Sequence, residues 1–210
     1  MASDDIDLSA VLASRICHDV VGPVGAISNG LELLEEEDDP EMRQQALDLL
    51  VHSAEQASRR LTFYRLAFGA SGGANMPVSL IEARMAATRW LEGGRTNLVW
   101  SDEATQAELA KPRLRLLLNL LLVAVEALPR GGDVTVDVSD DSQRLALVAS
   151  GTNVVVDADL SSALEGRVAA GELTPKQLPA HLAFRLASAL GGRLEFQSTG
   201  DEARFAAVFG

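Results

Sequence analysis

Two neighbouring stretches within residues 8–68 place apolar residues at alternating steps of four and three, and this spacing constrains the fold more than any other feature. The first stretch contains Ala13, Cys17, Val20, Val24, Ile27, Leu31 and Leu34. The second contains Leu47, Leu50, Ala54, Ala57, Leu61, Tyr64 and Phe68. A 3.5-residue repeat is typical of helices that pack as a left-handed bundle. The sequence therefore predicts two helices of about 25–30 residues each, joined by a turn at Glu36–Pro40.

Further apolar residues flank these two seams, and a single hairpin cannot bury them. They are Ile16, Val21, Leu33, Leu49 and Leu66. A second copy of the hairpin would cover them, so we expect a homodimer whose two hairpins form a four-helix bundle. Packing of the hairpin against the rest of the chain is the alternative.

A glycine-rich segment at residues 69–77 separates the hairpin from the remainder of the chain, as is typical of a domain connector. We therefore predict one domain over residues 1–70 and another over 77–210. Helix-period and strand-period segments alternate in the second, which predicts an α/β sandwich. The expected helices are Ser79–Leu91, Pro112–Leu128, Leu160–Arg167 and Pro175–Leu190. The expected strands are Asn97–Ser101, Asp133–Ser139, Arg144–Ala149, Arg193–Ser198 and Ala203–Val208.

Charge and cysteine content exclude several classes of function. The net charge is −12 and the isoelectric point is about 4.6, so binding to nucleic acid or to an anionic membrane is not expected. The single cysteine, Cys17, cannot form a disulfide within the chain and fits a reducing compartment. The acidic N-terminus does not resemble a secretory signal. The longest apolar run, Leu116–Val125, is too short to span a membrane, and a cytoplasmic protein is expected.

His18 is the candidate reactive residue because it points away from the seam that contains Cys17. Two glycines on its helix face each cost about 1 kcal/mol relative to alanine. Such a face suits a partner protein that lies flat on the helix, although chance tolerance or close packing is the alternative. The predicted docking residues on this face are Ser14, Arg15, Gly22, Gly25 and Asn29.

The neighbours of His18 strengthen this interpretation. The carboxylate of Asp19 can hold the proton of one ring nitrogen, which leaves the other nitrogen as a nucleophile. Pro23 removes a backbone donor inside the helix and predicts a kink beside the histidine. The other two histidines, His52 and His181, have no comparable setting and are interpreted as ordinary residues.

The stretch from His18 to Leu34 resembles the H-box of sensor histidine kinases, whose pattern His-(Asp/Glu)-x-x-x-Pro corresponds here to His18, Asp19 and Pro23. The resemblance continues through the hairpin and the connector into the α/β domain. That domain is similar to the GHKL-type ATP-binding domain of the same kinases, so the resemblance covers nearly all of the chain.

The ATP-binding positions depart from that family. Val123 occupies the place of the magnesium-binding asparagine, and Asn119 matches an earlier, non-coordinating position. The segment from Ala149 to Asn153 lacks the adenine-reading aspartate. Pro179 stands where a glycine-rich phosphate loop is expected, and proline has no backbone N–H to donate to phosphate. The resemblance therefore implies a kinase fold that has lost its nucleotide site.

A dimeric H-box hairpin with a degenerate ATP-binding domain resembles the ChpT family of histidine phosphotransferases. The resemblance implies that His18 accepts a phosphoryl group from the receiver domain of a hybrid histidine kinase (CckA-like). It further implies donation to response regulators (CtrA-like and CpdR-like) that control cell-cycle transcription. Mg²⁺ would come from the receiver, and the chain itself would bind no cofactor or metal. An ATP-dependent sensor histidine kinase core and a non-catalytic dimeric scaffold are the alternatives.

Overall fold

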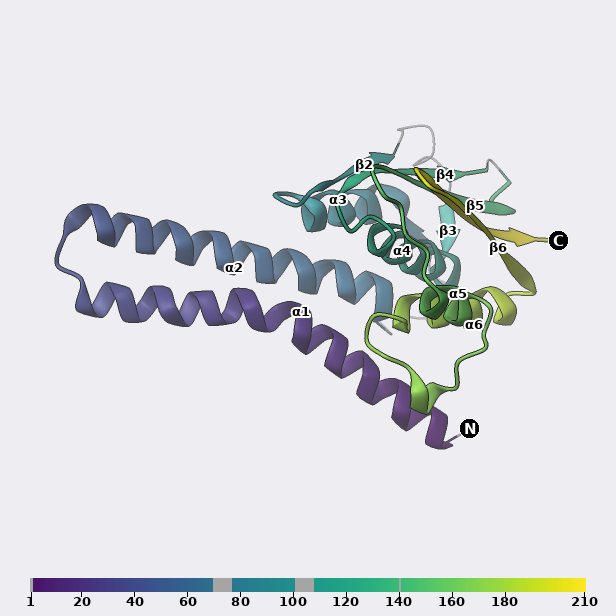
Figure 1. Ribbon diagram of the computed structural model, residues 1–210, viewed down its shortest axis with the longest axis horizontal. Helices are drawn as coiled ribbons and strands as arrows, with labels where there is room; N and C mark the ends of the chain where they lie inside the picture. Colours follow the sequence, from purple (N-terminus) through teal and green to yellow (C-terminus); the bar gives the residue numbers. More distant parts are fainter. Residues whose placement is uncertain (1, 70–76, 101–107, 140) are drawn as a thin grey trace.

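Two long antiparallel helices form an arm that projects from an α/β body (Figure 1). The structure is a computed structural model that describes residues 2–69, 77–100, 108–139 and 141–210. Helix α1 spans Ala2–Glu36 and helix α2 spans Pro40–Phe68. The two predicted helices and the turn between them therefore lie where the sequence predicts them.

The tip of the arm is closed by side chains that satisfy the free backbone groups of both helix ends. Asp39 accepts a hydrogen bond from the backbone N–H of Glu41 at 2.9 Å, which caps the start of α2. Arg43 donates to the carbonyl oxygens of Leu34 at 2.6 Å and Glu37 at 2.8 Å. An arginine at this place suits the negative end of the α1 dipole. Side chains of Asp39 and Arg43 thus stabilise the turn between α1 and α2.

The face along which α1 packs on α2 differs from the predicted seam. Pro23 and Gly30 of α1 are buried in the contact. A Cβ atom at Gly30 would lie 2.9 Å from Cγ of Leu50, so glycine permits the close approach. Several residues of the predicted seams remain about half exposed: Val24, Leu31, Leu47 and Leu61. The seam prediction was therefore wrong about which apolar face closes the hairpin.

The body contains a five-stranded sheet in the order β2-β4-β5-β7-β6. Strand β2 (Thr96–Trp100) pairs parallel with β4 (Gly132–Val138). The other pairs are antiparallel and involve β5 (Arg144–Ser150), β6 (Gly192–Thr199) and β7 (Glu202–Phe209). In the β4–β5 register, Val136 lies opposite Leu147 and both are buried. The predicted strands are confirmed to within one residue at each end, except that Ser101, the predicted end of the first strand, lies outside the described residues.

Helices pack against one face of this sheet (Figure 1). They are α3 (Leu80–Leu91), α4 (Lys111–Glu126) and α6 (Leu178–Ala189). Helix α5 (Ala158–Leu164) packs on α6. The middle of α4 is buried on every side from Leu116 to Ala124, so this helix forms the centre of the core. The sequence did not predict the three-residue strands β1 (Pro77–Ser79) and β3 (Glu108–Ala110) or the 3-10 turn η2 (Ala170–Glu172).

The base of the arm packs into the core of the body, whereas the outer part of the arm does not. The ring of Phe63 on α2 stacks on Trp90 of α3, with centroids 4.3 Å apart. The amide of Asn119 on α4 donates to the carbonyl oxygen of Ala67 at 3.1 Å. The alternative of packing against the rest of the chain is thus confirmed for the base of the hairpin. Residues 70–76 of the predicted connector lie outside the described residues, and the division of the chain into two domains there stays a prediction.

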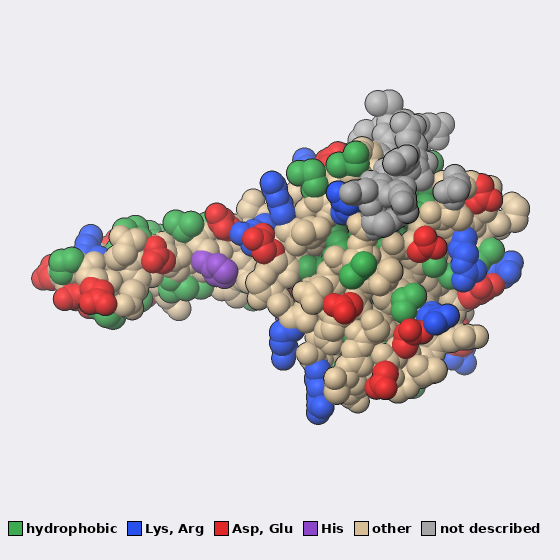
Figure 2. All heavy atoms as spheres, turned by 90° about the horizontal axis from the view of Figure 1, so that it is seen from above, with side chains coloured by type: hydrophobic (Ala, Val, Ile, Leu, Met, Phe, Trp, Pro, Cys, Tyr) green, Lys and Arg blue, Asp and Glu red, His purple; other side chains and the backbone are tan. Residues whose placement is uncertain are grey.

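Apolar side chains remain exposed along the outer arm, with acidic side chains at its tip (Figure 2). By length and composition alone, Asp4–Glu36 in α1 could cross a membrane. Residues 116–125, the longest apolar run in the sequence, lie instead in α4. The same apolar composition is required of a helix that packs in a bundle, and α1 also carries a charged pair, Arg15 and Asp19, near its middle.

Candidate functional site

His18 lies on the exposed side of α1, N-terminal to Pro23. Helix α1 is bent along its length (Figure 1). The side chain of His18 is 82% exposed, so a protein partner can reach the imidazole. Nδ1 lies 3.0 Å from Oδ1 of Asp19, within hydrogen-bond distance. The structure therefore joins the two residues that the sequence predicts as the reactive pair.

Asp19 is held on its other oxygen by two further donors. Oδ2 accepts a hydrogen bond from Nε of Arg15 at 2.7 Å and another from the hydroxyl of Tyr64 on α2. Burial favours the neutral acid, but hydrogen bonds from His18 and Tyr64 and the charge of Arg15 hold the pKa of Asp19 below its usual value. An ionised carboxylate only accepts, so Nδ1 of His18 carries the proton and Nε2 keeps its lone pair in the neutral ring.

Arg15 does not belong to an exposed docking face, and that prediction was wrong. Its side chain is 11% exposed, and a terminal nitrogen forms an ion pair with Glu126 of α4 at 2.8 Å. The same nitrogen donates to the carbonyl oxygen of Pro175 at 3.3 Å. Burial lowers the pKa of Arg15, but the charges of Glu126 and Asp19 outweigh it and raise the pKa above its usual value. Arg15 thus connects α1 to the body.

The bend in α1 has a local cause. Pro23 lies inside the helix and cannot donate to the carbonyl of Asp19, four residues earlier. The guanidinium of Arg60 on α2 donates to that carbonyl instead. The predicted kink therefore exists, and α2 supplies the hydrogen bond that α1 has lost.

The remaining predicted docking residues share the exposed face of His18. Ser14, Gly22, Gly25 and Asn29 are all exposed. A Cβ atom built at Gly22 or at Gly25 would meet nothing within 4 Å, so packing within this chain does not require either glycine. Their role in docking stays a prediction.

A cavity of about 380 Å³ opens next to Asp19, between the arm and the body. Its wall includes Asp19 of α1, Arg60 and Tyr64 of α2, and Arg95 and Thr96 of the body. Asp19 is therefore bordered by a polar, partly cationic cavity on the side that faces the body. Sequence reasoning missed Tyr64 and Arg60, because both lie far along the chain from His18.

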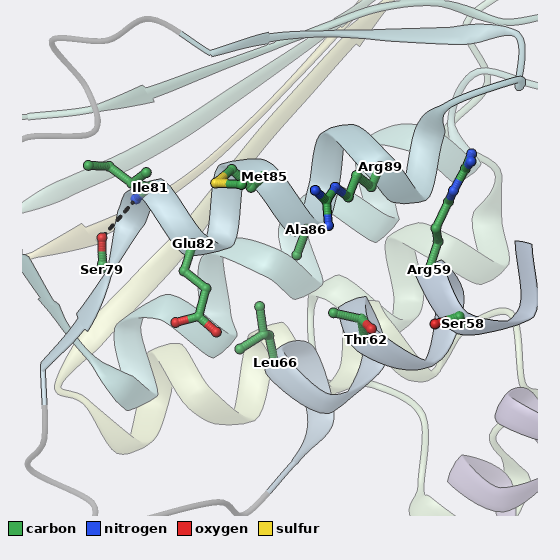
Figure 3. Close-up of a pocket in the computed structure, with 10 residues that line it drawn as sticks. All are labelled: Ser58, Arg59, Thr62, Leu66, Ser79, Ile81, Glu82, Met85, Ala86 and Arg89. Carbon is green, nitrogen blue, oxygen red and sulfur yellow. Dashed lines mark hydrogen bonds between the residues drawn. The ribbon is translucent and has the colours of Figure 1, made fainter. Parts of the chain in front are cut away.

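A separate cavity of about 400 Å³ lies between α2 and α3 (Figure 3). Ser79 caps α3 there by accepting a hydrogen bond from the backbone N–H of Ile81 at 3.2 Å. Leu66 and Met85 form apolar parts of its wall, and Arg59 lies at one end. None of the residues predicted from the sequence as site residues lines it.

The residues that the sequence matches to the ATP-binding positions of kinases lie in different settings, and the loss of the nucleotide site stays a prediction. Val123 and Ala149 are fully buried in the core, and Pro179 is buried in the first turn of α6. Asn153 is exposed and adopts a left-handed backbone, with φ of 65°. Within residues 2–69, 77–100, 108–139 and 141–210, no group of three His, Cys, Asp or Glu side chains could hold a metal ion.

The other histidines stand apart from this arrangement. His52 is exposed on α2, further toward the tip of the arm than the residues around Asp19. His181 is buried in α6, where desolvation and the nearby charge of Arg185 lower its pKa. Burial of His181 fits an ordinary core residue, as the sequence predicts.

Known proteins are similar to this chain in sequence and in fold. Residues 80–202 match the histidine phosphotransferase C-terminal domain family. The chain is 35% identical over 204 residues to the protein phosphotransferase ChpT of Brucella abortus (strain 2308), which covers 96% of this chain and 95% of that protein. A solved structure of a bacterial phosphotransferase is 32% identical, covers 96% of each chain and has a TM-score of 0.82. The chain therefore belongs to the ChpT-type histidine phosphotransferases, the enzymes that pass phosphoryl groups along a phosphorelay.

Proposed function

We propose that His18 carries the phosphoryl group, and that it does so on Nε2. The observation that supports this most directly is the division of roles in the imidazole. Nδ1 is engaged by Asp19, while the side chain is 82% exposed and offers its other nitrogen to a partner. A nucleophile needs a free lone pair and an open approach, and Nε2 has both.

The donor in this proposal is the phospho-aspartate of the receiver domain of a hybrid histidine kinase (CckA-like). The lone pair of Nε2 on His18 attacks phosphorus, the acyl-phosphate P–O bond breaks, and the aspartate of the receiver leaves as a carboxylate. The proton stays on Nδ1, so the phosphorylated ring is an imidazolium that Asp19 stabilises. The reverse step delivers the group to the aspartates of response regulators (CtrA-like and CpdR-like), which would control cell-cycle transcription. Mg²⁺ bound by the receiver would neutralise charge on the phosphoryl oxygens.

This chemistry requires positioning rather than an internal energy source. The residues in the former nucleotide site support a protein that binds no ATP. Val123 and Ala149 contribute to the packed core, and Pro179 lacks the backbone N–H that a phosphate would need. An ATP-dependent kinase core would need polar side chains at the first two positions and a backbone N–H donor at the third.

We also propose that the functional unit is a cytoplasmic homodimer formed through the arm. Val24 and Leu31 on α1 and Leu47 and Leu61 on α2 are 45 to 52% exposed, although they carry the bundle-forming repeat. A second arm would bury them in a four-helix bundle. Light scattering tests this directly: the wild type is expected at twice the mass of one chain, and Leu31→Glu at a lower average mass.

The deciding experiment uses a receiver domain labelled on its aspartate with radioactive acetyl phosphate in Mg²⁺. We expect the label to reach the wild-type protein and the His52→Ala variant, but not the His18→Ala variant. His52 is a matched control because it is an exposed histidine on the same arm. No transfer to the wild type, or equal transfer to His18→Ala, would overturn the proposal and favour a scaffold. Labelling by ATP alone would favour a kinase.

A further inference from the structure

The hydrogen bond between His18 and Asp19 joins two residues that are adjacent in a helix. Side chains at positions i and i+1 of a helix point about 100° apart and do not face each other. The Asp19 carboxylate therefore has to be turned toward His18 by something other than the helix itself. The structure shows what turns it, because Oδ2 is occupied by two donors while Oδ1 lies 3.0 Å from Nδ1 of His18.

We propose that Tyr64, Arg15 and Glu126 are positioning residues, which fix the Asp19 carboxylate and thereby keep His18 in its Nδ1-protonated form. The inference rests on the proposed function, because phosphoryl transfer to Nε2 requires the form of His18 that is protonated on Nδ1. None of the three touches the reacting nitrogen in the structure. They act on it only through Asp19.

Tyr64 provides the first fixed point. Its side chain is 3% exposed, and its ring packs against Phe63 and Phe68, so the hydroxyl cannot move freely. Burial and the hydrogen bond to Asp19 raise the pKa of Tyr64, so its hydroxyl remains a donor at neutral pH. A buried hydroxyl aimed at one carboxylate oxygen sets the position of that oxygen.

Arg15 and Glu126 provide the second fixed point. Arg15 donates to Asp19 at 2.7 Å from Nε, and its terminal nitrogen pairs with Glu126 at 2.8 Å. Glu126 is the last residue of α4, the central helix of the core, so its backbone is anchored in the body. A planar guanidinium that bridges two carboxylates holds both in one geometry. The orientation of the Asp19 carboxylate is therefore fixed relative to the body, through Arg15 and Glu126, as well as relative to α2, through Tyr64.

The consequence for His18 concerns which ring nitrogen is protonated. A neutral imidazole exchanges its proton between Nδ1 and Nε2, and the acceptor that lies beside one nitrogen decides the balance. Only the form that is protonated on Nδ1 has a lone pair on the exposed Nε2. If the carboxylate of Asp19 is released, part of the protein changes to the unreactive form. The rate of phosphoryl transfer then falls with the reactive fraction, on the order of 10-fold.

The test compares the full-length wild type with Tyr64→Phe and Glu126→Gln. Tyr64→Phe removes only the hydroxyl and keeps the buried ring. Glu126→Gln removes the charge that holds Arg15. Glu55→Gln is the matched control for Glu126→Gln, because it breaks an ion pair of similar length on the arm, 2.7 Å to Arg59 against 2.8 Å between Arg15 and Glu126. Two-bond ¹H–¹⁵N spectra report the protonation of Nδ1 and Nε2 of His18, and transfer from the phosphorylated receiver reports the rate.

We expect Tyr64→Phe and Glu126→Gln to shift the His18 nitrogen signals toward Nε2 protonation and to slow transfer by about 10-fold. Glu55→Gln should leave both unchanged. Slower transfer with unchanged nitrogen signals, or shifted signals with an unchanged rate, would overturn the positioning role. Shifted signals in a protein whose wild type never accepts label would support the positioning of His18 and refute its proposed function.

Discussion

The guanidinium of Arg60 donates a hydrogen bond to the backbone carbonyl oxygen of Asp19, which is the carbonyl that Pro23 leaves without its helical donor. This contact joins α2 to α1 at the bend. Asp19 is thereby held through its backbone by Arg60 and through its side chain by Tyr64. Because Pro23 leaves the carbonyl of Asp19 without its helical donor, Arg60 of α2 can bind α1 at the residue next to His18.

Replacement of Arg60 by alanine is expected to destabilise the protein by about 1–3 kcal/mol, because the half-buried carbonyl of Asp19 loses its donor. In a Pro23→Ala background the restored backbone N–H would serve the same carbonyl, so the cost of Arg60→Ala should shrink. Urea unfolding of the four proteins measures the coupling as a double-mutant cycle. Equal costs in both backgrounds would show that Arg60 does not compensate for the proline.

The glycines on the His18 face give a second prediction. Gly22→Ala should raise the free energy of unfolding by about 1 kcal/mol, because alanine is the better helix former and the space is open. It should also slow transfer from the receiver if a partner lies on this face. Gly30→Ala is the control with the opposite effect on stability, because its Cβ would lie 2.9 Å from Cγ of Leu50. Unchanged transfer with Gly22→Ala would argue against the docking face.

Asn119 connects the core of the body to the end of the arm. Its amide donates to the carbonyl oxygens of Ala67 at 3.1 Å and Arg115 at 2.8 Å, in a fully buried position. Asn119→Ala is expected to cost about 1–3 kcal/mol in thermal or urea unfolding, since a buried carbonyl is left unpaired. Asn97→Ala, which removes an exposed hydrogen bond to Asp133, should cost much less. Similar losses in the two variants would contradict this view.

The pKa of Asp19 predicts how stability depends on pH. Its pKa in the folded protein lies below the usual 3.8. A carboxyl group of this kind stabilises the fold above its unfolded pKa, and the contribution is lost as the pH falls through the folded pKa. The free-energy difference between wild type and Asp19→Asn should therefore be constant near pH 6 and shrink below about pH 4. A difference that grows on acidification would contradict the sign.

Nucleotide should leave the melting temperature unchanged. A ligand that binds only the folded state raises the melting temperature, and the buried Val123, Ala149 and Pro179 offer ATP no polar ligand. Differential scanning fluorimetry with Mg²⁺ and ATP measures this, and a histidine kinase domain with an intact site serves as the positive control. A clear rise in the melting temperature of this protein with Mg²⁺ and ATP would support the alternative of an ATP-dependent kinase.

Much of the fold could be predicted from the sequence because its signals are local. The 3.5-residue repeat gave both helices of the arm, and the alternation of Val134, Val136 and Val138 gave β4. The resemblance to the H-box singled out His18 and Asp19, which the structure joins by a hydrogen bond. Strands β1 and β3 were missed because three residues are too few to show an alternating pattern.

The arrangement around the histidine pair could not be predicted, because it depends on contacts between distant parts of the chain. Arg15 follows Ser14 on the helix and was placed on the exposed face, but its partner Glu126 lies on α4. Tyr64 fits an apolar seam, and only the fold shows its hydroxyl at Asp19. The seam itself was misplaced because α1 is apolar on two faces, and spacing does not say which one meets α2 first.

The path of α1 also decides how the two parts of the molecule stay together. Its first half packs against η2 and α6 of the body, and its second half packs along α2 (Figure 1). The chain passes from arm to body once in sequence, after Phe68, but α1 holds the same two parts together a second time without a covalent link. A protease that cut once between α2 and β1 would therefore leave the two fragments associated. His18 would remain on the N-terminal fragment, whose helix α1 contacts the body.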